Sequence, residues 1–277
     1  MLALILAAAF TLPPQQSDAV IGVTAIHVDS GRRISVRGTE RFPMGSVYKV
    51  PIALTVLKRV DSGTMRLDRA ITIEPKDFAP GWSPLRDRAN GRAITLTIRE
   101  LLMHTVQMSD NTSSDALLRM VGPHAVTTRM AELGFAGIRI DRTETEMARD
   151  LRATGGVERY AIDVRDTTSP DAMAGLMLAI HQKKDGLSNA SHDLLVQWMT
   201  ETTTGARRIK AGVPKSATVT HKTGTMPGTA NDAGIVIVGD DEVVMAIFTK
   251  ASKRDVTADQ EADIAEVAAK VWEELTR

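Results

Sequence analysis

The distribution of apolar and polar residues separates strand-like runs at the two ends of the chain from helix-like repeats in its middle. Apolar and β-branched residues fill 19–28, and a second run, 33–36, follows the turn-forming Asp29-Ser30-Gly31. Two such runs around a turn predict a β-hairpin. Further runs of the same kind predict strands near the C-terminus, at 217–221, 233–238 and 243–249.

The middle of the chain repeats its apolar residues at the spacing of one helical turn. One such repeat begins at Ser46 and predicts a helix from that serine onward. Thr97 followed by Glu100 has the form of a helix-capping box, and Ser169 followed by Pro170 is typical of a helix start. The helices expected on these grounds cover 46–60, 96–103, 111–120, 124–133, 169–181, 188–200 and 259–275.

These elements predict an α/β protein of the α+β type. Strands from both chain ends would pair in one antiparallel sheet of about five strands flanked by helices, because terminal strands joined around an inserted helical unit form the economical arrangement. We expect residues 18–44 and 201–277 to form the sheet domain and residues 45–200 an all-α domain, which includes a long polar active-site loop over 142–166. The active site is then expected between the two domains.

The N-terminus carries an apolar segment, 2–10, that ends before a Pro-Pro pair. It is too short to span a membrane, but it resembles the apolar core of a secretory signal, with Ala7 and Ala9 as small residues near a cleavage site. A buried first helix is the alternative, because the basic region that precedes such a core is missing. We expect 1–17 to be a signal segment and the mature chain to lie in the periplasm or outside the cell.

Composition narrows the possible functions. Of the 277 residues, 43% are hydrophobic and 25% are charged, and the formal net charge is zero, so neither nucleic acid nor a membrane is expected as a partner of the mature chain. The chain has no cysteine, which excludes disulfides, thiol nucleophiles and thiolate metal sites. Its six histidines lack the spacing of a zinc hydrolase. We expect a monomer that acts on a small molecule without a metal or cofactor.

Ser46 and Lys49 form the first pair of residues with clear chemical potential. A serine hydroxyl becomes a strong nucleophile only when a base removes its proton. On a helix, Lys49 lies on the same face as Ser46, and a partly buried lysine can act as that base. A Ser-x-x-Lys string more often marks an ordinary helix start with both side chains in solvent, but the apolar residues on both sides favour a buried helix.

Two further strings add polar groups that such a site could use. Ser109-Asp110-Asn111 precedes an expected helix, where capping is the simpler interpretation of the string taken alone. The Lys-Thr-Gly-Thr string at 222–225 lies on an expected strand. Lysine is rarely buried without a partner, so solvation at a sheet edge is the alternative to a role in the site.

The ordered set of these strings, with Glu144 after Arg142, resembles the signature of the class A serine β-lactamases in the penicillin-recognising family. The resemblance extends from about residue 19 to the C-terminus. His221 before the Lys-Thr-Gly string and the Thr-Thr-Thr-Gly run at 202–205 are similar to the extended-spectrum subgroup. Other segments that resemble the family are 41–44, 166–170, 201–205, 211–214 and 231–232.

The resemblance implies an acyl-enzyme mechanism. Ser46 would be the acylated nucleophile and Lys49 its activating partner, while Ser109 would pass a proton to the β-lactam nitrogen as that nitrogen leaves. The backbone N–H groups of Ser46 and Thr225 would form the oxyanion hole, and Glu144 would activate the water that releases the product. Whether Lys49 or Glu144 is the base for acylation is open within the family.

The resemblance also implies a set of substrate-binding residues. Asn111 would bind the amide of the substrate's side chain, and Trp82 would stand at the mouth of the site. A carboxylate of the substrate would be bound by Lys222, Thr223, Gly224 and Thr225, with Arg208 in support.

Three departures from the family pattern concern the region of the glutamate. Arg142 and Asp166 resemble the ion pair that closes the neck of the family's loop, but the segment between them is several residues longer. Thr145 replaces the usual proline after the glutamate, and Ala148 stands where many members have an asparagine that helps to hold the water. Glu146 is a second, less favoured candidate base.

We interpret the chain as a secreted serine β-lactamase that opens the β-lactam ring of antibiotics and so confers resistance. Two alternatives are open on the sequence alone. A penicillin-binding DD-peptidase shares the serine, the lysine and the Lys-Thr-Gly string but usually lacks the loop glutamate. A β-lactam-binding sensor without hydrolytic activity would fit the altered surroundings of Glu144.

Overall fold

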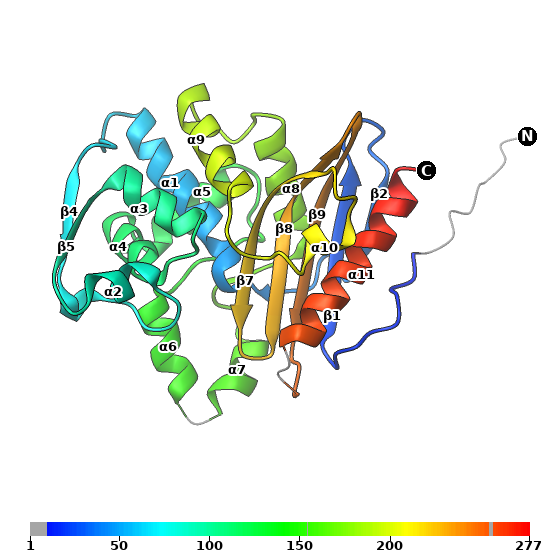
Figure 1. Ribbon diagram of the computed structural model, residues 1–277, viewed down its shortest axis with the longest axis horizontal. Helices are drawn as coiled ribbons and strands as arrows, with labels where there is room; N and C mark the ends of the chain where they lie inside the picture. The colour runs from blue at the N-terminus through cyan, green and yellow to red at the C-terminus, as the bar shows by residue number, and fades with distance from the viewer. Residues whose placement is uncertain (1–9, 154, 255–256) are drawn as a thin grey trace, which may run out of the picture.

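The computed structural model describes residues 10–153, 155–254 and 257–277. Most of the expected signal core therefore lies outside the described residues. Strands from both ends of the chain form one antiparallel sheet in the order β2-β1-β9-β8-β7, as the sequence predicts (Figure 1). Their bounds are Val20–His27 (β1), Arg33–Val36 (β2), Thr218–Met226 (β7), Thr229–Val238 (β8) and Asp241–Lys250 (β9).

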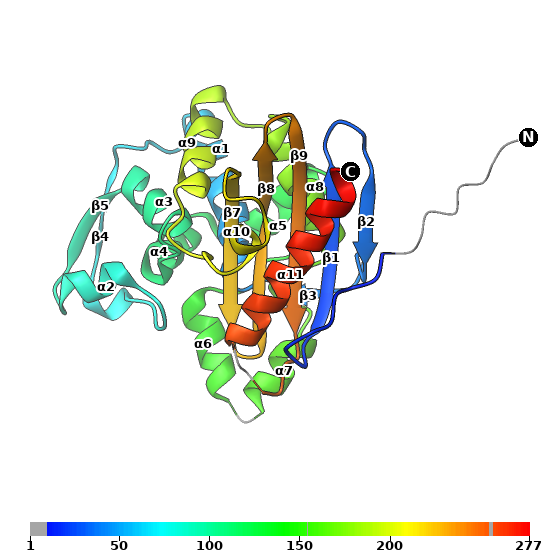
Figure 2. The ribbon, with the colours of Figure 1, turned by 45° about the vertical axis from the view of Figure 1, so that its right-hand side comes forward.

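Helices cover both faces of the sheet (Figure 2). The C-terminal helix α11 (Thr257–Leu275) packs on one face, and α8 (Pro170–His181) packs on the other. Successive residues of a strand point to opposite faces. In β9, Ile247 accordingly belongs to the core under α11, while Phe248 belongs to the core under α8. A sheet buried on both faces explains why the runs 233–238 of β8 and 243–248 of β9 are continuously apolar.

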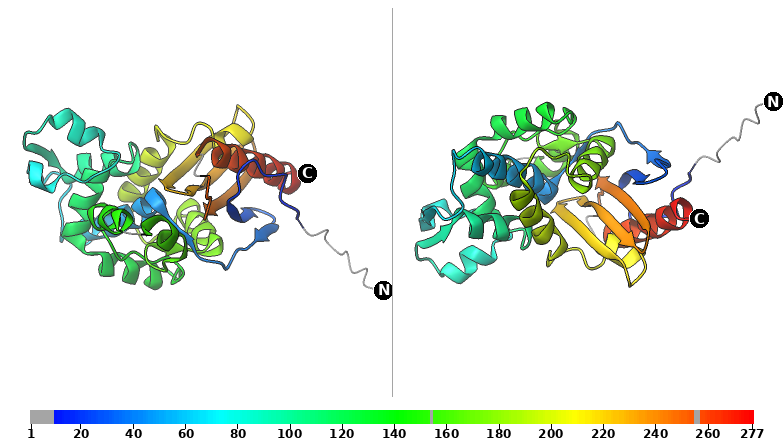
Figure 3. Two further views of the ribbon diagram at one scale, coloured as in Figure 1. Left: turned by 90° about the horizontal axis from the view of Figure 1, so that it is seen from below. Right: turned by 90° about the horizontal axis from the view of Figure 1, so that it is seen from above.

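The helical region lies beside the β7 edge of the sheet, with α1 (Lys49–Asp61) running through its centre (Figure 3). A short 3-10 turn, η1 (Gly45–Tyr48), precedes α1 and contacts β7 directly. Every residue from 49 to 57 is buried, as expected for a helix surrounded by other elements. The remaining helices outside 142–166 are η2 (Pro75–Asp77), α2 (Pro84–Ala89), α3 (Ile98–Val106), α4 (Asn111–Val121), α5 (Pro123–Glu132), α9 (Asn189–Thr200) and α10 (Ile209–Gly212).

The region 45–200, expected to be all-helical, also contains short strands. β4 (Ala70–Ile73) and β5 (Ile94–Thr97) pair as a two-stranded ribbon within it. The helix expected from residue 96 therefore begins at residue 98, because Thr97 ends β5 and caps α3. The expected capping box with Glu100 is confirmed. A second small ribbon joins β3 (Phe42–Pro43) to β6 (Thr167–Thr168).

Residues 142–166 form a structured segment rather than the polar loop that the sequence predicts. The segment contains α6 (Glu144–Arg152) and α7 (Gly156–Ile162). Thr143 caps α6 and forms a capping box with Glu146. Because apolar residues are scarce here, periodicity gives no helical signal, and only the cap indicates where α6 begins.

Candidate active site

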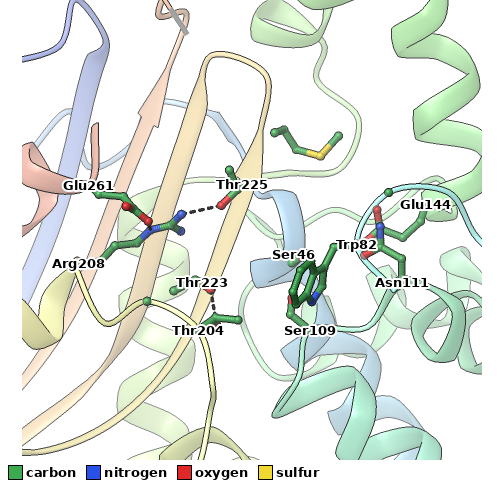
Figure 4. Close-up of a pocket in the computed structure, with 13 residues that line it drawn as sticks. Ser46, Trp82, Ser109, Asn111, Glu144, Thr204, Arg208, Thr223, Thr225 and Glu261 are labelled. Carbon is green, nitrogen blue, oxygen red and sulfur yellow. Dashed lines mark hydrogen bonds and ion pairs between the residues drawn. The ribbon is translucent and has the colours of Figure 1, made fainter. Parts of the chain in front are cut away.

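A cavity of about 430 Å³ lies where η1, the edge strand β7 and the helical region meet. Figure 4 shows side chains from the strand side and from the helical side around this space. Lys49, Lys222 and Gly224 do not line the cavity, but they contact residues that do, as described below. The predicted site residues that line the cavity are Ser46, Trp82, Ser109, Asn111, Glu144, Arg208, Thr223 and Thr225.

Ser46 and Lys49 are joined by a hydrogen bond. The turn of η1 brings the Lys49 Nζ to 3.0 Å from the Ser46 Oγ. The same ammonium group donates to the Ser109 backbone oxygen at 2.8 Å and to the Asn111 Oδ1 at 2.7 Å, and it lies 3.2 Å from the Glu144 Oε1. Lys49 is fully buried, so polar groups of the site surround its ammonium. The alternative of a solvent-facing helix start is therefore wrong.

Two glycines allow the backbone of β7 to approach the nucleophile closely. Gly45 has a φ of 49°, in the left-handed region that favours glycine, and a Cβ there would lie 3.0 Å from the Thr225 nitrogen. A Cβ on Gly224 would lie 2.2 Å from the Met44 oxygen and 3.0 Å from the Ser46 nitrogen. Larger residues at either position would push η1 and β7 apart. The close contact brings the backbone nitrogens of Ser46 and Thr225 to one junction.

Lys222 is fully buried although β7 is an edge strand. Its Nζ donates to the Ser109 Oγ at 2.8 Å and to the Thr223 backbone oxygen at 3.1 Å. Burial, reinforced by the positive charge of Lys49, lowers the pKa of Lys222 well below its usual value. Solvation at the sheet edge is therefore the wrong interpretation of this lysine, which faces a serine inside the site.

The Ser-Asp-Asn string both caps a helix and contributes side chains to the wall of the cavity. Asp110 caps α4, because its side chain accepts a hydrogen bond from the Ser113 N–H at 2.8 Å. Ser109 and Asn111, on either side of the cap, line the cavity. Ser109 has a φ of 57°, a sparsely populated conformation for a residue with a side chain. Such strain is often found at functional sites.

Arg208 is buried and makes a hydrogen bond through each of its nitrogens. Nη1 donates to the backbone oxygens of Gly224 and Asn231 at 2.9 and 2.8 Å. Nη2 donates to the Thr225 Oγ1 at 2.6 Å, and Nε donates to the Glu261 Oε1 at 3.2 Å. Glu261 lies on α11 and also lines the cavity. No local pattern in the sequence points to Glu261, because a single acidic residue on an amphipathic helix gives no signal of its partner.

Asp115 is a second site residue that the sequence analysis missed. It lies on α4 and is fully buried. Its carboxylate accepts hydrogen bonds from the Glu144 N–H at 2.6 Å, from the Thr145 N–H at 3.1 Å and from the Thr145 Oγ1 at 2.7 Å. Burial raises the pKa of Asp115. Thr145, in place of the family's proline, thus supplies two donors that anchor the start of α6.

Arg142 and Asp166 form the ion pair that the resemblance implies. Arg142 Nε lies 2.6 Å from the Asp166 Oδ2, and its Nη1 lies 2.8 Å from an Asp150 oxygen and 3.3 Å from an Asp163 oxygen. The Asp166 Oδ1 also accepts hydrogen bonds from the backbone N–H groups of Asp141 and Arg142. Burial nevertheless raises the pKa of Asp166. The neck of the segment is therefore a dense, largely buried charge network.

The mouth and one side of the cavity are more open. Trp82 is 63% exposed, and its indole N–H donates to the Met108 backbone oxygen at 3.0 Å. Ala148 lines an adjoining cavity of about 380 Å³, which shares Asn111 and Glu144 with the first. Apolar side chains form much of its wall, namely Pro80, Leu151, Met226 and Pro227.

A serine hydrogen-bonded to a buried lysine, beside two converging backbone nitrogens and a carboxylate, is the arrangement that a serine hydrolase working through an acyl-enzyme requires. Comparison with known proteins identifies the family. The family model described as "Beta-lactamase enzyme family" matches residues 5–275. The β-lactamase VEB-1 of Pseudomonas aeruginosa is 31% identical over 265 residues, which cover 92% of this chain and 85% of that enzyme. The carbapenem-hydrolysing β-lactamase KPC of Klebsiella oxytoca is 33% identical, over 87% of this chain and 79% of that enzyme.

Solved structures agree with these sequence matches. A β-lactamase from Chitinophaga pinensis has a TM-score of 0.83 and 34% identity, over 93% of this chain and 94% of that one. The extended-spectrum β-lactamase TLA-3 has a TM-score of 0.84 and 30% identity, over 94% of both chains. The chain belongs to the β-lactamase enzyme family and is a class A serine β-lactamase, a hydrolase of β-lactams that confers antibiotic resistance. The peptidase and sensor alternatives are thereby set aside.

Proposed function

We propose that Ser46 and Lys49 carry out the acylation step. The observation that supports this assignment most strongly is the hydrogen bond between the Lys49 Nζ and the Ser46 Oγ inside a buried site. Glu144, 3.2 Å from the Nζ, takes a proton from Lys49, and the resulting amine takes the proton of the Ser46 hydroxyl. The Oγ then bonds to the β-lactam carbonyl carbon, whose oxygen becomes an oxyanion.

We also propose that the residues where η1 meets β7 stabilise the tetrahedral intermediate that carries this oxyanion and promote its breakdown. The backbone N–H groups of Ser46 and Thr225 stabilise the oxyanion, a type of contact worth about 3–4 kcal/mol per donor. As the ring C–N bond breaks, the Ser109 Oγ gives its proton to the nitrogen. Lys222, whose Nζ lies 2.8 Å from that oxygen, replaces the proton from an ammonium whose pKa is already lowered.

We assign deacylation to Glu144 as the base, once the proton that it took during acylation has passed back through Lys49 and Ser109 to Lys222, which restores both the Glu144 carboxylate and the Lys222 ammonium. Hydrolysis needs a water near a carboxylate base and in line with the ester carbonyl. Glu144 and Ser46 line the same cavity, and the bond from the Glu144 N–H to Asp115 fixes the backbone that carries the carboxylate. Because Ala148 cannot form a side-chain hydrogen bond, the water takes the ester oxygen of Ser46 as its second partner.

Substrate binding follows from the donors around the cavity. Asn111 uses one amide hydrogen on the Pro80 backbone oxygen, so its other amide hydrogen is available to the amide of the substrate's side chain. That side chain extends into the adjoining cavity beside Ala148, where the apolar wall suits a bulky group. Trp82 covers the mouth. The substrate carboxylate binds at Lys222, Thr223, Gly224, Thr225 and Arg208.

We also propose how the chain is divided into domains, that it acts as a monomer, and that it is secreted. Residues 18–44 and 201–277 form the sheet domain and residues 45–200 the helical domain, and β-lactams bind between them as a single small-molecule substrate of a monomeric enzyme. Within the ranges that the structure describes, no helix combines the length and apolarity needed to cross a membrane. We further propose that 1–17 directs secretion to the periplasm or the medium.

The direct test of the nucleophile is the variant Ser46→Ala. It should lose turnover of benzylpenicillin altogether, because removal of the nucleophile leaves no group that can form the acyl-enzyme. Ser62→Ala, which truncates an exposed serine at the end of α1, is the matched control and should keep wild-type rates. Near-wild-type hydrolysis by Ser46→Ala would show that the serine mechanism is wrong.

A further inference from the structure

We propose that a separate cavity, within the segment 142–166, is a binding site for a small tetrahedral oxyanion such as phosphate or sulfate. The cavity has a volume of about 310 Å³ and is lined by residues of α6 and α7, which lie side by side (Figure 1). It shares Leu151 with the cavity beside Ala148 and no lining residue with the cavity that contains Ser46. An occupant would therefore leave the nucleophile accessible. The polar residues of its wall are Arg142, Asp150, Arg159, Tyr160, Asp163 and Arg165.

Arg142 brings a buried donor without an acceptor to the wall of this cavity. Its Nε donates to the Asp166 Oδ2 at 2.6 Å, and its Nη1 donates to the Asp150 Oδ2 at 2.8 Å. Its Nη2 has no hydrogen-bond partner among the residues that the structure describes, although Arg142 is only 5% exposed. A buried charged donor that has lost its hydration and found no acceptor is costly to the folded state. An oxygen of a bound anion would supply that acceptor.

The charges of the wall favour an anion over a cation. Three arginines and two aspartates line the cavity, which gives a net charge of +1. Both aspartates are already neutralised, because Asp150 and Asp163 each lie within 3.3 Å of a nitrogen of Arg142 and of a nitrogen of Arg165. Arg159, in contrast, forms no ion pair within the described ranges, and it is exposed to solvent. The groups left over are therefore guanidinium donors, whose planar forks match the oxygens of phosphate and sulfate.

The size of the cavity and the origin of its wall residues define what a bound oxyanion does. A water molecule takes up about 30 Å³ in the liquid, so the cavity has room for a five-atom oxyanion together with several waters. Arg142 precedes α6, whereas Arg159 lies on α7. An anion bound by both arginines would join the two helices of the segment that carries Glu144. Because it binds the folded segment, it should raise the stability of the protein in proportion to its occupancy.

The test is calorimetric titration of the full enzyme with inorganic phosphate, at an ionic strength held constant with sodium chloride. We expect saturable binding to the wild type, and weaker binding of acetate, which carries a smaller charge. Arg159→Gln should weaken phosphate binding about three- to tenfold, as loss of one nearby unit charge near the surface implies. Arg152→Gln is the matched control, because it makes the same change at an exposed residue of α6 that does not line the cavity, and it should leave the affinity unchanged.

A second variant separates this cavity from the catalytic one, which also contains cations. Lys222→Ala removes a cation from the catalytic site, so binding that persists in Lys222→Ala and weakens in Arg159→Gln supports the proposal. The reverse pattern would place the phosphate in the catalytic cavity and overturn it. Absence of saturable binding to the wild type, or equal affinity in the wild type and Arg159→Gln, would overturn it as well. Phosphate should also raise the melting temperature of the wild type more than that of Arg159→Gln, whereas its general salting effect acts on both proteins alike.

Discussion

Replacing Arg142 with alanine should destabilise the protein substantially, and more so in mild alkali than in mild acid. The guanidinium contacts the carboxylates of Asp166, Asp150 and Asp163, and Asp166 is almost fully buried. Removing one partner of a buried ion pair typically costs about 3–5 kcal/mol, because the other charge stays buried without compensation. Asp150 and Asp163 keep Arg165 as a partner, so most of the loss should come from Asp166.

The pH dependence follows from the pKa of Asp166. Burial raises this pKa above its usual value even in the wild type, and Arg142 opposes the rise, so the alanine variant should show a larger one. A carboxyl whose pKa is higher in the folded state binds more protons folded than unfolded. Stability therefore falls as the pH rises through the interval between the two pKa values, by at most about 1.4 kcal/mol per pH unit. Acid should partly rescue the variant.

Urea denaturation of both proteins across the range from about pH 5 to about pH 8 would measure this difference. Arg165→Ala is the matched control, because Arg165 binds two of the same carboxylates but is 43% exposed. Exposed pairs contribute only about 0–1 kcal/mol, so the control should lose little at any pH. A loss below about 1 kcal/mol for Arg142→Ala, or a loss that does not change with pH, would refute the reasoning.

Two further predictions concern the substrate site and the N-terminus. Lys222→Ala should lower kcat/KM for benzylpenicillin about ten- to one-hundred-and-fifty-fold, because charge-assisted hydrogen bonds are worth about 1.5–3 kcal/mol; an unchanged kcat/KM would contradict the role assigned to Lys222. The mature chain should begin after residue 9 or later, since the apolar run 2–10 carries small residues at Ala7 and Ala9. N-terminal sequencing of protein from the periplasm or medium of the native host would check this, and recovery of an intact Met1 would argue against export.

The elements that sequence predicts well are those whose signals are local. The helices starting near residues 46, 98 and 170 combine apolar periodicity with a cap or an apolar flank, and the first hairpin has its turn residues in place. The apolar run 217–221 marks only the first half of β7; the Lys-Thr-Gly-Thr string, which was also expected on a strand, continues it and pairs with β8 in full register. α6 and the β4–β5 ribbon were missed because polar or short segments carry little periodicity.

The residues of the site likewise fall into those that have a local sequence signal and those that have none. Ser46, Lys49 and Lys222 stand in ordered strings, and the structure brings them to one cavity and its immediate support. Asp115 and Glu261 have no such string. Each acquires its role from partners distant in the chain, a backbone N–H at residue 144 for Asp115 and a guanidinium at residue 208 for Glu261. Hydrogen bonds of this kind depend on how the helices pack in the folded protein, and short sequence patterns do not specify that packing.

The central claim is that Ser46 forms an acyl-enzyme and that Glu144 activates the water that removes it. Intact-protein mass spectrometry of Glu144→Gln, mixed with a good β-lactam substrate, tests this claim most directly. We predict a covalent adduct with the mass of the intact drug, mapped to Ser46 and absent from a variant that also carries Ser46→Ala. Rapid turnover by Glu144→Gln without an adduct would contradict the claim and move the base to Glu146 or elsewhere, while a stable adduct on the unmutated enzyme would contradict its assignment as a hydrolase.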